Sequence, residues 1–282
     1  MAHVSALDDL IALLDLEAIE VNIFRGRSPD EDQQRVFGGQ VAGQALVAAA
    51  RTVERGMVHS LHAYFLRPGD PKIPILYDVD RIRDGRSFAT RRVVAIQHGQ
   101  AIFNLQASFH VDEQGLEHQF PFPANIPDPD TLPTFEERMA PLYQRMGRSI
   151  PKRPIDTRLL DEKGAPDEPG RPGQRLWLRA DGQLPDDPML HACVVTYASD
   201  LNLLDTTLVP HGLSLIDTGV QMASLDHAMW FHRPFRADEW LLYDQTTPST
   251  SAARGLAIGH LFNRSGELVV TVVQEGLLRA VV

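Results

Sequence analysis

The hydrophobic pattern of the chain occurs twice, once in each half of the sequence. In each half, apolar runs rich in Val, Ile, Phe and Tyr are separated by short polar turns, at 83–85, 98–99 and 264–266. Apolar runs bounded by turn residues are typical of strands. Short turns between successive strands indicate antiparallel pairing, so each half is predicted to end in an antiparallel sheet.

One long apolar segment precedes the strands in each half and is predicted to be a helix. The first, 38–53, is dominated by alanine and lacks proline; the second, 188–204, follows two aspartates and begins with proline, which suits the first helical position. Both are apolar on most faces, so both helices must be buried. With opening strands expected at 17–24 and 154–160, each half resembles one helix wrapped by a long antiparallel sheet. The predicted fold class is α+β, a double hotdog.

Similarity between the halves supports this duplication. SLHAYFLRPGD at 60–70 matches DHAMWFHRPFRAD at 226–238 around a shared Arg-Pro pair. GQAIFNLQASF at 99–109 likewise matches GELVVTVVQEG at 266–276, and both are apolar runs opened by a glycine turn. A weak internal repeat of this length predicts two copies of one structural unit.

The stretch between the two copies is rich in proline, which predicts an extended linker with one short helix at 134–148. A second Pro/Gly-rich stretch, 164–174, is predicted to be a loop and the most mobile segment. The predicted domains are an N-terminal hotdog at 1–115, a linker at 116–149 and a C-terminal hotdog at 150–282.

Composition and charge narrow the classes of function. The 282 residues suit two domains, and the net charge of −10 argues against nucleic acid as a partner, because phosphate backbones require a basic face. An anionic small ligand is still possible, since a local arginine cluster can bind phosphate. The apolar N-terminal stretch contains acids and favours neither a signal peptide nor a membrane span, so a cytoplasmic protein is expected.

Motifs for several common chemistries are missing from the sequence. It contains no G-x-S-x-G, no HExxH, no P-loop and no G-x-G-x-x-G. The single cysteine, Cys193, can form no internal disulfide, and its apolar neighbours predict a buried core residue. No metal and no cofactor are therefore expected.

Asp200 is the most informative ionisable residue, because it falls within the predicted helix 188–204 among apolar neighbours. A carboxylate there is costly unless it is paired or faces a cleft. It either points to solvent or binds local backbone amides, or it acts as a general base whose pKa desolvation raises toward neutral. The matching helix 38–53 contains no carboxylate, so the first half is predicted to be a catalytically degenerate copy.

Several long motifs carry a family resemblance that spans nearly the whole chain. They are FGGQVAGQAL (37–46), VHSLHAYFLRPGD (58–70), YASDLNLL (197–204), DHAMWFHRPF (226–235) and TVVQEGLLR (271–279). In these the chain resembles the acyl-CoA thioesterase II family. The resemblance implies a double hotdog that hydrolyses fatty acyl-CoA thioesters, with CoA as part of the substrate rather than a cofactor.

The resemblance also implies the catalytic residues. The family's aspartate falls on Asp200, its glutamine on Gln274, and its threonine or serine on Ser224. Asp200 would accept a proton from the attacking water, while Gln274 and Ser224 would orient both groups and stabilise oxyanion charge. No covalent acyl-enzyme is required. Taken singly, Gln274 could be a satisfied strand residue and Ser224 a structural one.

Other polar residues stay open at this stage. His59 is the runner-up catalytic candidate. On a regular strand, Asp226 would share a face with Ser224 and His227 would face the other side. The acyl chain needs an apolar tunnel, and Met222, Met229, Trp230 and Phe231 could line it or simply fill the core. The residues that contact CoA are not assigned. Four arginines could bind the CoA phosphates or could equally form ion pairs at the surface or between domains: Arg67, Arg91, Arg92 and Arg254.

Two alternative functions compete with hydrolysis. A hotdog enoyl-CoA hydratase or dehydratase would pair a histidine with a carboxylate, and the sequence around Asp200 offers no obvious histidine partner. A non-catalytic acyl-CoA-binding module would not require the complete Asp, Ser and Gln set. The resemblance further implies a homo-oligomer, a dimer or tetramer.

Overall fold

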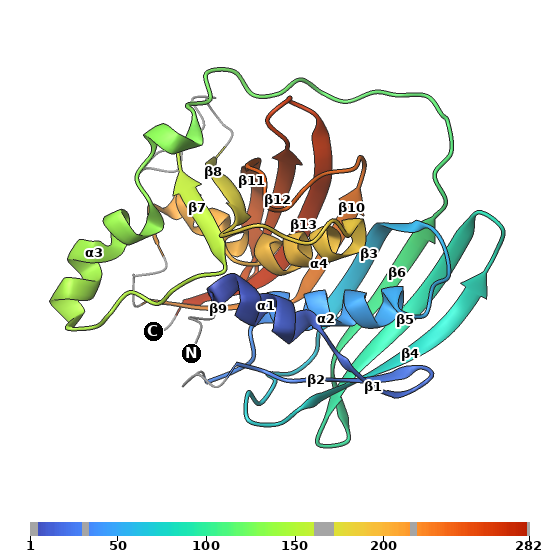
Figure 1. Cartoon of the computed structure of the whole chain (residues 1–282). Helices are drawn as coiled ribbons and strands as arrows, with labels where there is room; N and C mark the ends of the chain where they lie inside the picture. The colour runs from blue at the N-terminus through green and yellow to red at the C-terminus, as the bar shows by residue number, and fades with distance from the viewer. Residues whose placement is uncertain (1–4, 30–33, 161–171, 215–218, 281–282) are drawn as a thin grey trace.

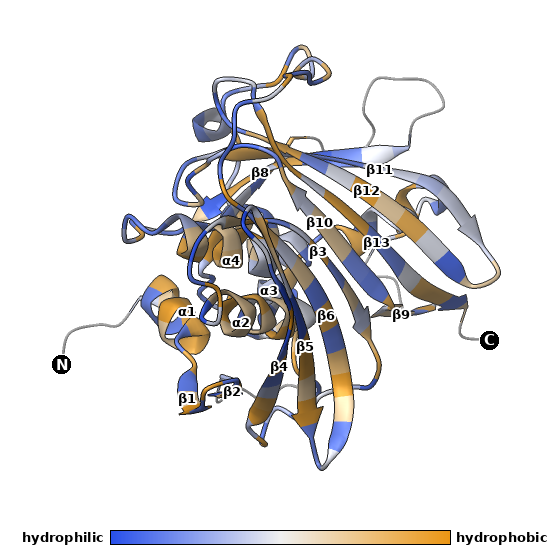
Figure 2. Ribbon diagram, turned by 90° about the vertical axis from the view of Figure 1, so that its right-hand side faces the viewer, coloured by the Kyte–Doolittle hydropathy of each residue, from blue (hydrophilic) through white to orange (hydrophobic). Residues whose placement is uncertain are grey.

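The computed structural model describes residues 5–29, 34–160, 172–214 and 219–280, and its strands form one antiparallel sheet around two central helices (Figure 1). Seen from the side, the helices α1, α2 and α4 lie together on one face of the curved sheet (Figure 2). The elements of the first half are α1 (Ala6–Leu14), β1 (Glu17–Glu20), β2 (Ile23–Gly26), α2 (Gly38–Ala50), β3 (Met57–Phe65), β4 (Ile75–Asp84), β5 (Phe88–Gln97) and β6 (Gln100–His110). After them come η1 (Pro129–Thr131), α3 (Phe135–Met146), β7 (Ile155–Leu159), β8 (Gly173–Ala180), α4 (Pro188–Ser199), η2 (Leu204–His211), β9 (Val220–Ser224), β10 (Asp226–Phe231), β11 (Leu241–Ser251), β12 (Arg254–Phe262) and β13 (Leu268–Ala280).

The two halves meet in the middle of the sheet, where β3 pairs with β10. In this ladder His62 lies opposite Ala228 and Ala63 opposite His227. Both strands carry the segments matched in the repeat, and they pair antiparallel, so the halves are related by an approximate two-fold axis between them. The chain is a fused pair of hotdog units, which confirms the predicted fold class.

The central helices α2 and α4 are buried between the sheet and α1, as their apolar surfaces require. Small residues along α2 let the two helices approach closely; a Cβ at Gly43 would lie 3.3 Å from the carbonyl oxygen of Cys193 in α4. Helix α1 was not anticipated. It begins with a capping box between Ser5 and Asp8 and buries three leucines in the core.

Helix α4 ends earlier than the sequence pattern predicted. The expected helix ran to residue 204, whereas the observed one stops at Ser199, with Asp200 as its C-cap. Asp200 and Asn202 have short polar side chains that compete with the helical backbone for hydrogen bonds, so the chain turns there and continues as η2. The prediction that Asp200 lies within a helix was therefore wrong, and the carboxylate stands at a helix end.

The strands before the central helices also differ from the predictions. The expected strand at 17–24 is a hairpin of two short strands, β1 and β2, whereas the one expected at 154–160 is confirmed as β7. Of the predicted loop 164–174, Gly173 and Gln174 instead begin β8, because they continue its pairing with β11. The rest of that loop except Pro172 lies outside the described residues.

The linker packs against the second half of the chain. Its predicted helix is confirmed as α3, which Thr134 caps. Before that helix, Phe122, Ile126 and Leu132 pack on a second apolar cluster that contains Trp177 and Phe262. None of the described helices has both the length and the apolar character needed to cross a bilayer.

Candidate active site

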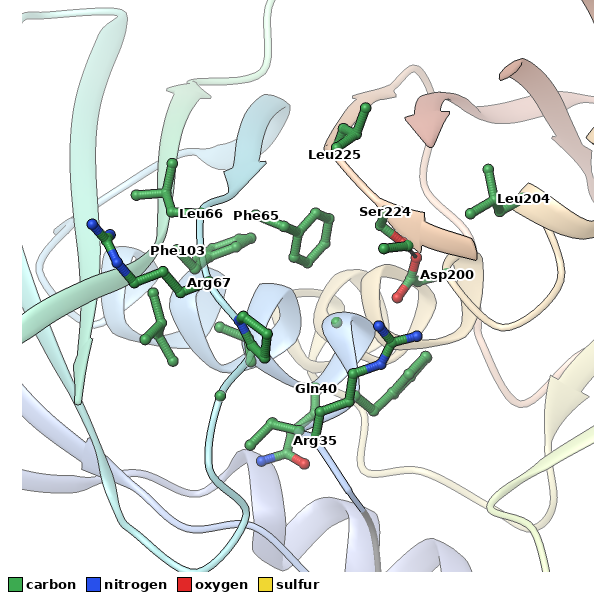
Figure 3. A pocket seen from close by; sticks show the side chains of 18 of the residues that line it. Arg35, Gln40, Phe65, Leu66, Arg67, Phe103, Asp200, Leu204, Ser224 and Leu225 are labelled. Atoms are coloured by element: carbon green, nitrogen blue, oxygen red, sulfur yellow. Dashed lines mark hydrogen bonds between the residues drawn. The ribbon is translucent and has the colours of Figure 1, made fainter. Parts of the chain in front are cut away.

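Asp200, Ser224 and Gln274, which are far apart in the sequence, meet at one point of the structure. The Gln274 Nε2 amide lies 2.7 Å from Asp200 Oδ1 and 2.8 Å from Ser224 Oγ, and the Ser224 hydroxyl lies 3.3 Å from the same Asp200 oxygen. Each of the three side chains therefore contacts the other two. Figure 3 shows Asp200 and Ser224 facing each other at the wall of a cavity.

Asp200 reaches this position because α4 ends opposite the start of α2. A Cβ at Gly38 would lie 2.7 Å from Asp200 Oδ2, so only glycine lets the carboxylate approach so closely. The N-cap of α2 is Phe37, which offers no side-chain hydrogen bond, and the backbone of Gly39 bonds Asp200 instead. A carboxylate at a helix N-terminus is favoured by the helix dipole and by the unpaired N–H groups there.

Ser224 reaches the site through a break between β9 and β10 at Leu225. Ser224 pairs with Gly276 whereas Ala228 pairs with Val273, so the register along β13 shifts by one residue between them. Such a β-bulge reverses the alternation of side chains. The expected facing was therefore wrong: Ser224 shares the inner face with His227, while Asp226 accepts a hydrogen bond from the Glu275 N–H at 2.7 Å.

Gln274 lies in the middle of β13. Its side chain is fully buried, because β13 runs between β10 and β12 and the residue faces the helices. Both hydrogens of its amide point at Asp200 and Ser224. An amide with two donors is suited to fixing one carboxylate orientation.

Burial controls the charge of Asp200. Desolvation raises its pKa to about 6, against hydrogen bonds from Gln274, Gly39 and Ser224 and the nearby charge of Arg35, which all lower it. The shift toward neutral that the sequence suggested is confirmed. A carboxylate with a pKa near 6 is ionised at neutral pH and still basic enough to accept a proton.

The cavity beside the three residues has a volume of about 830 Å³ and runs between the two halves of the chain. Arg35 and Arg67 lie on its wall, and Arg67 is held by a 2.7 Å hydrogen bond to the Ala101 carbonyl (Figure 3). Of the residues considered for an acyl tunnel, Met222 lines the cavity, whereas Met229 is a fully buried core residue. The wall also contains Phe65, Leu66, Ile102, Phe103, Leu201 and Leu204.

Sequence reasoning missed two charged residues of this cavity. Asp205 lines it, and burial raises the pKa of that carboxyl to about 7, with a further rise from the charge of Asp200. Arg35 lines it as well, and donates to the Met222 carbonyl at 3.3 Å. Neither residue lies in a segment that the internal repeat matches. The one sequence signal for the cavity was the position of Asp205, five residues after Asp200.

Two other candidate residues lie away from the cavity. His59 lies 2.8 Å from Ser108 Oγ, and its ring contacts those of Phe88 and His110. Cys193 is buried in the core, as predicted, and desolvation raises the pKa of its thiol well above the ordinary value. Neither residue lines the cavity that contains Asp200.

Comparison with known proteins identifies the family. A model of acyl-CoA thioesterase matches residues 166–277, and a model of the acyl-CoA thioesterase N-terminal domain matches residues 27–110. Acyl-coenzyme A thioesterase 8 of Mus musculus is 43% identical, over 95% of this chain and 88% of its own length. The chain belongs to the acyl-CoA thioesterase family. Acyl-CoA thioesterase 2 of Haemophilus influenzae is 39% identical over 97% of this chain and 98% of its own.

A solved structure agrees with this assignment. The crystal structure of an acyl-CoA thioesterase II, TesB2, from Mycobacterium marinum has a TM-score of 0.82 and 46% identity, covering 97% of this chain and 98% of that one. The similarity to that structure extends over both hotdog units and the linker, so it is not limited to one of the two units.

The N-terminal half of this thioesterase places different residues at the equivalent point. Ala107 corresponds to Gln274 in the repeat, and their partners on the neighbouring strand differ: Ala107 pairs with Arg91, and Gln274 pairs with Ala257. The Arg91 side chain is 1% exposed and donates to Thr52, just after α2, through Nε to Oγ1 at 2.8 Å. An arginine therefore lies in the N-terminal half at the point equivalent to the cluster of Asp200, Ser224 and Gln274.

Replacing Arg91 by methionine is expected to lower the free energy of unfolding by about 3 kcal/mol. The guanidinium donates to the backbone carbonyls of Thr52, Arg83 and Thr90 and pairs with Asp84, and these acceptors would lose their donor. Urea denaturation measures the change. Arg92→Met is the matched control, because Arg92 is 56% exposed and its pair with Asp80 is 3.4 Å long; equal losses for the two variants would contradict this account.

Proposed function

We propose that this chain hydrolyses acyl-CoA thioesters to a free fatty acid and CoA, using water activated by Asp200. Water attacks the thioester carbonyl carbon and Asp200 accepts its proton; the C–S bond then breaks and the CoA thiolate leaves and is protonated. The observation that carries the proposal is the mutual contact of Asp200, Ser224 and Gln274, of which Asp200 and Ser224 line the cavity. Family membership supports the reaction.

The two oxygen atoms of Asp200 have different surroundings, which suggests a different role for each. Asp200 Oδ1 accepts from Gln274 and Ser224, which hold the carboxylate in one orientation. Oδ2 lies beside Gly38 at the start of α2, where any side chain would collide with the carboxylate. Donors that are already held in place stabilise developing negative charge without reorganising, so the N–H groups at the α2 N-terminus are suited to the oxyanion.

The two arginines suggest where the CoA portion lies. Arg35 and Arg67 are on the same cavity as Asp200, in a chain whose net charge is −10. An arginine fork matches phosphate oxygens, so these cations provide a local attraction for an anionic substrate. The apolar wall around Phe65, Phe103 and Leu201 suits an acyl chain. CoA is part of the substrate here, and the reaction as proposed uses no cofactor.

The proposal is tested by incubating the purified chain with a panel of acyl-CoAs of different lengths and detecting free thiol. Enoyl-CoA absorbance is followed in the same samples. Thiol release with unchanged enoyl absorbance is expected. A change in enoyl absorbance without thiol would favour the hydratase, and tight binding with neither signal would favour a non-catalytic acyl-CoA-binding module.

The rate of hydrolysis is expected to fall as the pH decreases through about 6, because protonation removes the base at Asp200. Asp205, with a pKa of about 7, lies in the same cavity, so the acidic limb should be broader than one titration. The profile of kcat/KM at constant ionic strength measures this. A rate that stays level across the limb would argue against a carboxylate base.

Two features of the biological setting belong to the same proposal. A cytoplasmic enzyme agrees with a single buried cysteine, since thiols persist in reducing compartments.

A homo-oligomer, dimer or tetramer, is proposed because the outer face of the sheet exposes Met57, Tyr64 and Phe88, which a partner could cover. Light scattering of the purified chain gives the oligomer number.

A further inference from the structure

A buried histidine stands directly behind the glutamine of the site. His227 is 1% exposed and lies on β10, next to β13. The β10–β13 ladder pairs Ala228 with Val273, and continuing this register by one residue places His227 opposite Gln274. Both side chains face inward. Side chains directly opposite each other on neighbouring antiparallel strands are close enough to contact.

Two buried polar atoms face this contact without a well-aligned hydrogen bond. They are Nδ1 of His227 and Oε1 of Gln274, and neither has another partner among the residues described. The amide is nevertheless close enough to raise the pKa of His227 slightly, against desolvation, which lowers it to about 4. Buried polar atoms normally find partners, so a small rearrangement that joins these two is strongly favoured.

The hydrogen atoms can be assigned by counting donors. Gln274 uses both amide hydrogens, toward Asp200 and Ser224, so its Oε1 needs an external donor. Turning the amide over would set its oxygen against the ionised carboxylate. On the other side of the ring, Nε2 of His227 lies 2.9 Å from the Ser199 hydroxyl.

The single hydrogen of the Ser199 hydroxyl can be donated either to Nε2 of His227 or to the Thr196 carbonyl oxygen, which lies 3.0 Å away. If it donates to Thr196, His227 must carry its proton on Nε2, and the Nδ1 lone pair would then face the Gln274 oxygen. Two buried acceptors facing each other repel. If Ser199 donates to Nε2, the proton lies on Nδ1 and every buried atom of the pair is satisfied.

We propose that His227 is a positioning residue: its Nδ1–H holds the Gln274 amide oxygen and thereby keeps the amide hydrogens directed at Asp200 and Ser224. The inference rests on the proposed function of those three residues. His227 stays neutral through the working pH range, because burial disfavours its charged form, so it provides one donor and one acceptor and does not act as a base.

Asparagine and glutamine substitutions separate positioning from packing. In His227→Asn the new side-chain amide places its nitrogen near the position of Nδ1, whereas in His227→Gln the amide nitrogen reaches toward the position of Nε2. His227→Gln is expected to lower kcat by about 10- to 100-fold with little change in KM. His227→Asn should recover most of that loss. Equal losses in the two variants, or a loss confined to KM, would overturn the proposal.

The pH profile provides a readout that a purely structural role would not move. The Gln274 hydrogen bond lowers the pKa of Asp200, so losing its orientation raises that pKa and moves the acidic limb of kcat to higher pH in His227→Gln. The other charged or titratable groups that act on Asp200 are Arg35, Asp205 and Tyr243, and these are unchanged in the variant. An unmoved limb would contradict the proposal.

Two further measurements keep the inference independent of variant stability and of the mechanism. Nitrogen-15 chemical shifts of histidine in the unmodified protein report the tautomer, and protonation of Nε2 at His227 would overturn the proposal. In a double-mutant cycle, His227→Gln should have little further effect once Gln274 is alanine, whereas additive losses would refute the coupling. Failure of the proposed function itself would appear differently, as full activity in Gln274→Ala alone.

Discussion

Replacing Asp200 by asparagine is expected to lower kcat for acyl-CoA hydrolysis by about 10³-fold. Asparagine keeps the shape of the side chain and can still contact Ser224 and Gln274, but it cannot accept a proton from water. The structure shows no second carboxylate in contact with Ser224 or Gln274 among the described residues. Single-turnover thiol release measures the loss without interference from product dissociation.

The same variant should fold at least as stably as the unmodified protein. Burial raises the pKa of Asp200 from an ordinary 3.8 to about 6, so the ionised carboxylate is less favourable in the folded chain than in the unfolded one. That cost appears as the pH rises from about 4 to 6 and is fully present above it. The stability advantage of Asp200→Asn over the unmodified protein should therefore grow over this range, as urea denaturation at several pH values would show.

Asp205→Asn is the matched control for Asp200→Asn. Asp205 lines the same cavity, and its carboxyl is also buried, but it does not contact Ser224 or Gln274. The control should keep its activity within about tenfold, and its acidic limb should narrow to the single titration of Asp200, because the second carboxyl, with a pKa of about 7, is removed. If Asp205→Asn loses activity and Asp200→Asn keeps it, the base has been assigned to the wrong residue.

Replacing Gln274 by glutamate is expected to lower kcat by about 10²- to 10³-fold at neutral pH. The substitution preserves volume but exchanges two amide donors for a carboxylate that faces Asp200 at 2.7 Å in the unmodified protein. Two carboxylates so close cannot both ionise readily, and the pair will share a proton. Asp200 therefore loses its orienting donor, and part of the population loses its charge.

The neighbouring residue offers a control for this substitution. Glu275 lies next to Gln274 on β13, points to the other face and pairs with Arg254 at 2.9 Å. Glu275→Gln changes one charge on the same strand and should leave kcat nearly unchanged. The Gln274→Glu variant should regain part of its activity only where one carboxyl is protonated and the other ionised, so a loss that does not depend on pH would contradict the electrostatic explanation.

Much of the architecture was readable from the sequence because it depends on local patterns. Alanine-rich and apolar stretches predicted α2 and α4, turn residues delimited the strands, and the repeat predicted two copies of one unit. The resemblance to known motifs then brought forward Asp200, Ser224 and Gln274.

The details that make these residues a site depend on register and were not readable locally. The one-residue shift at Leu225 turns Ser224 and His227 to the same face, although the alternation of an ordinary strand separates them. The end of α4 at Ser199 sets Asp200 against the start of α2, which is distant in the sequence.

The sequence by itself thus determined two hotdog units, because short-range hydrophobic periodicity and turn chemistry are properties of neighbouring residues. The family resemblance, and not these patterns, brought together Asp200, Ser224 and Gln274. The tertiary structure alone decided which side chains share the cavity with Asp200, including Arg35 and Asp205, and which residue stands behind Gln274. The pKa of Asp200 belongs to this second group. Desolvation and hydrogen bonds from other segments set it, and these exist only once the chain has folded.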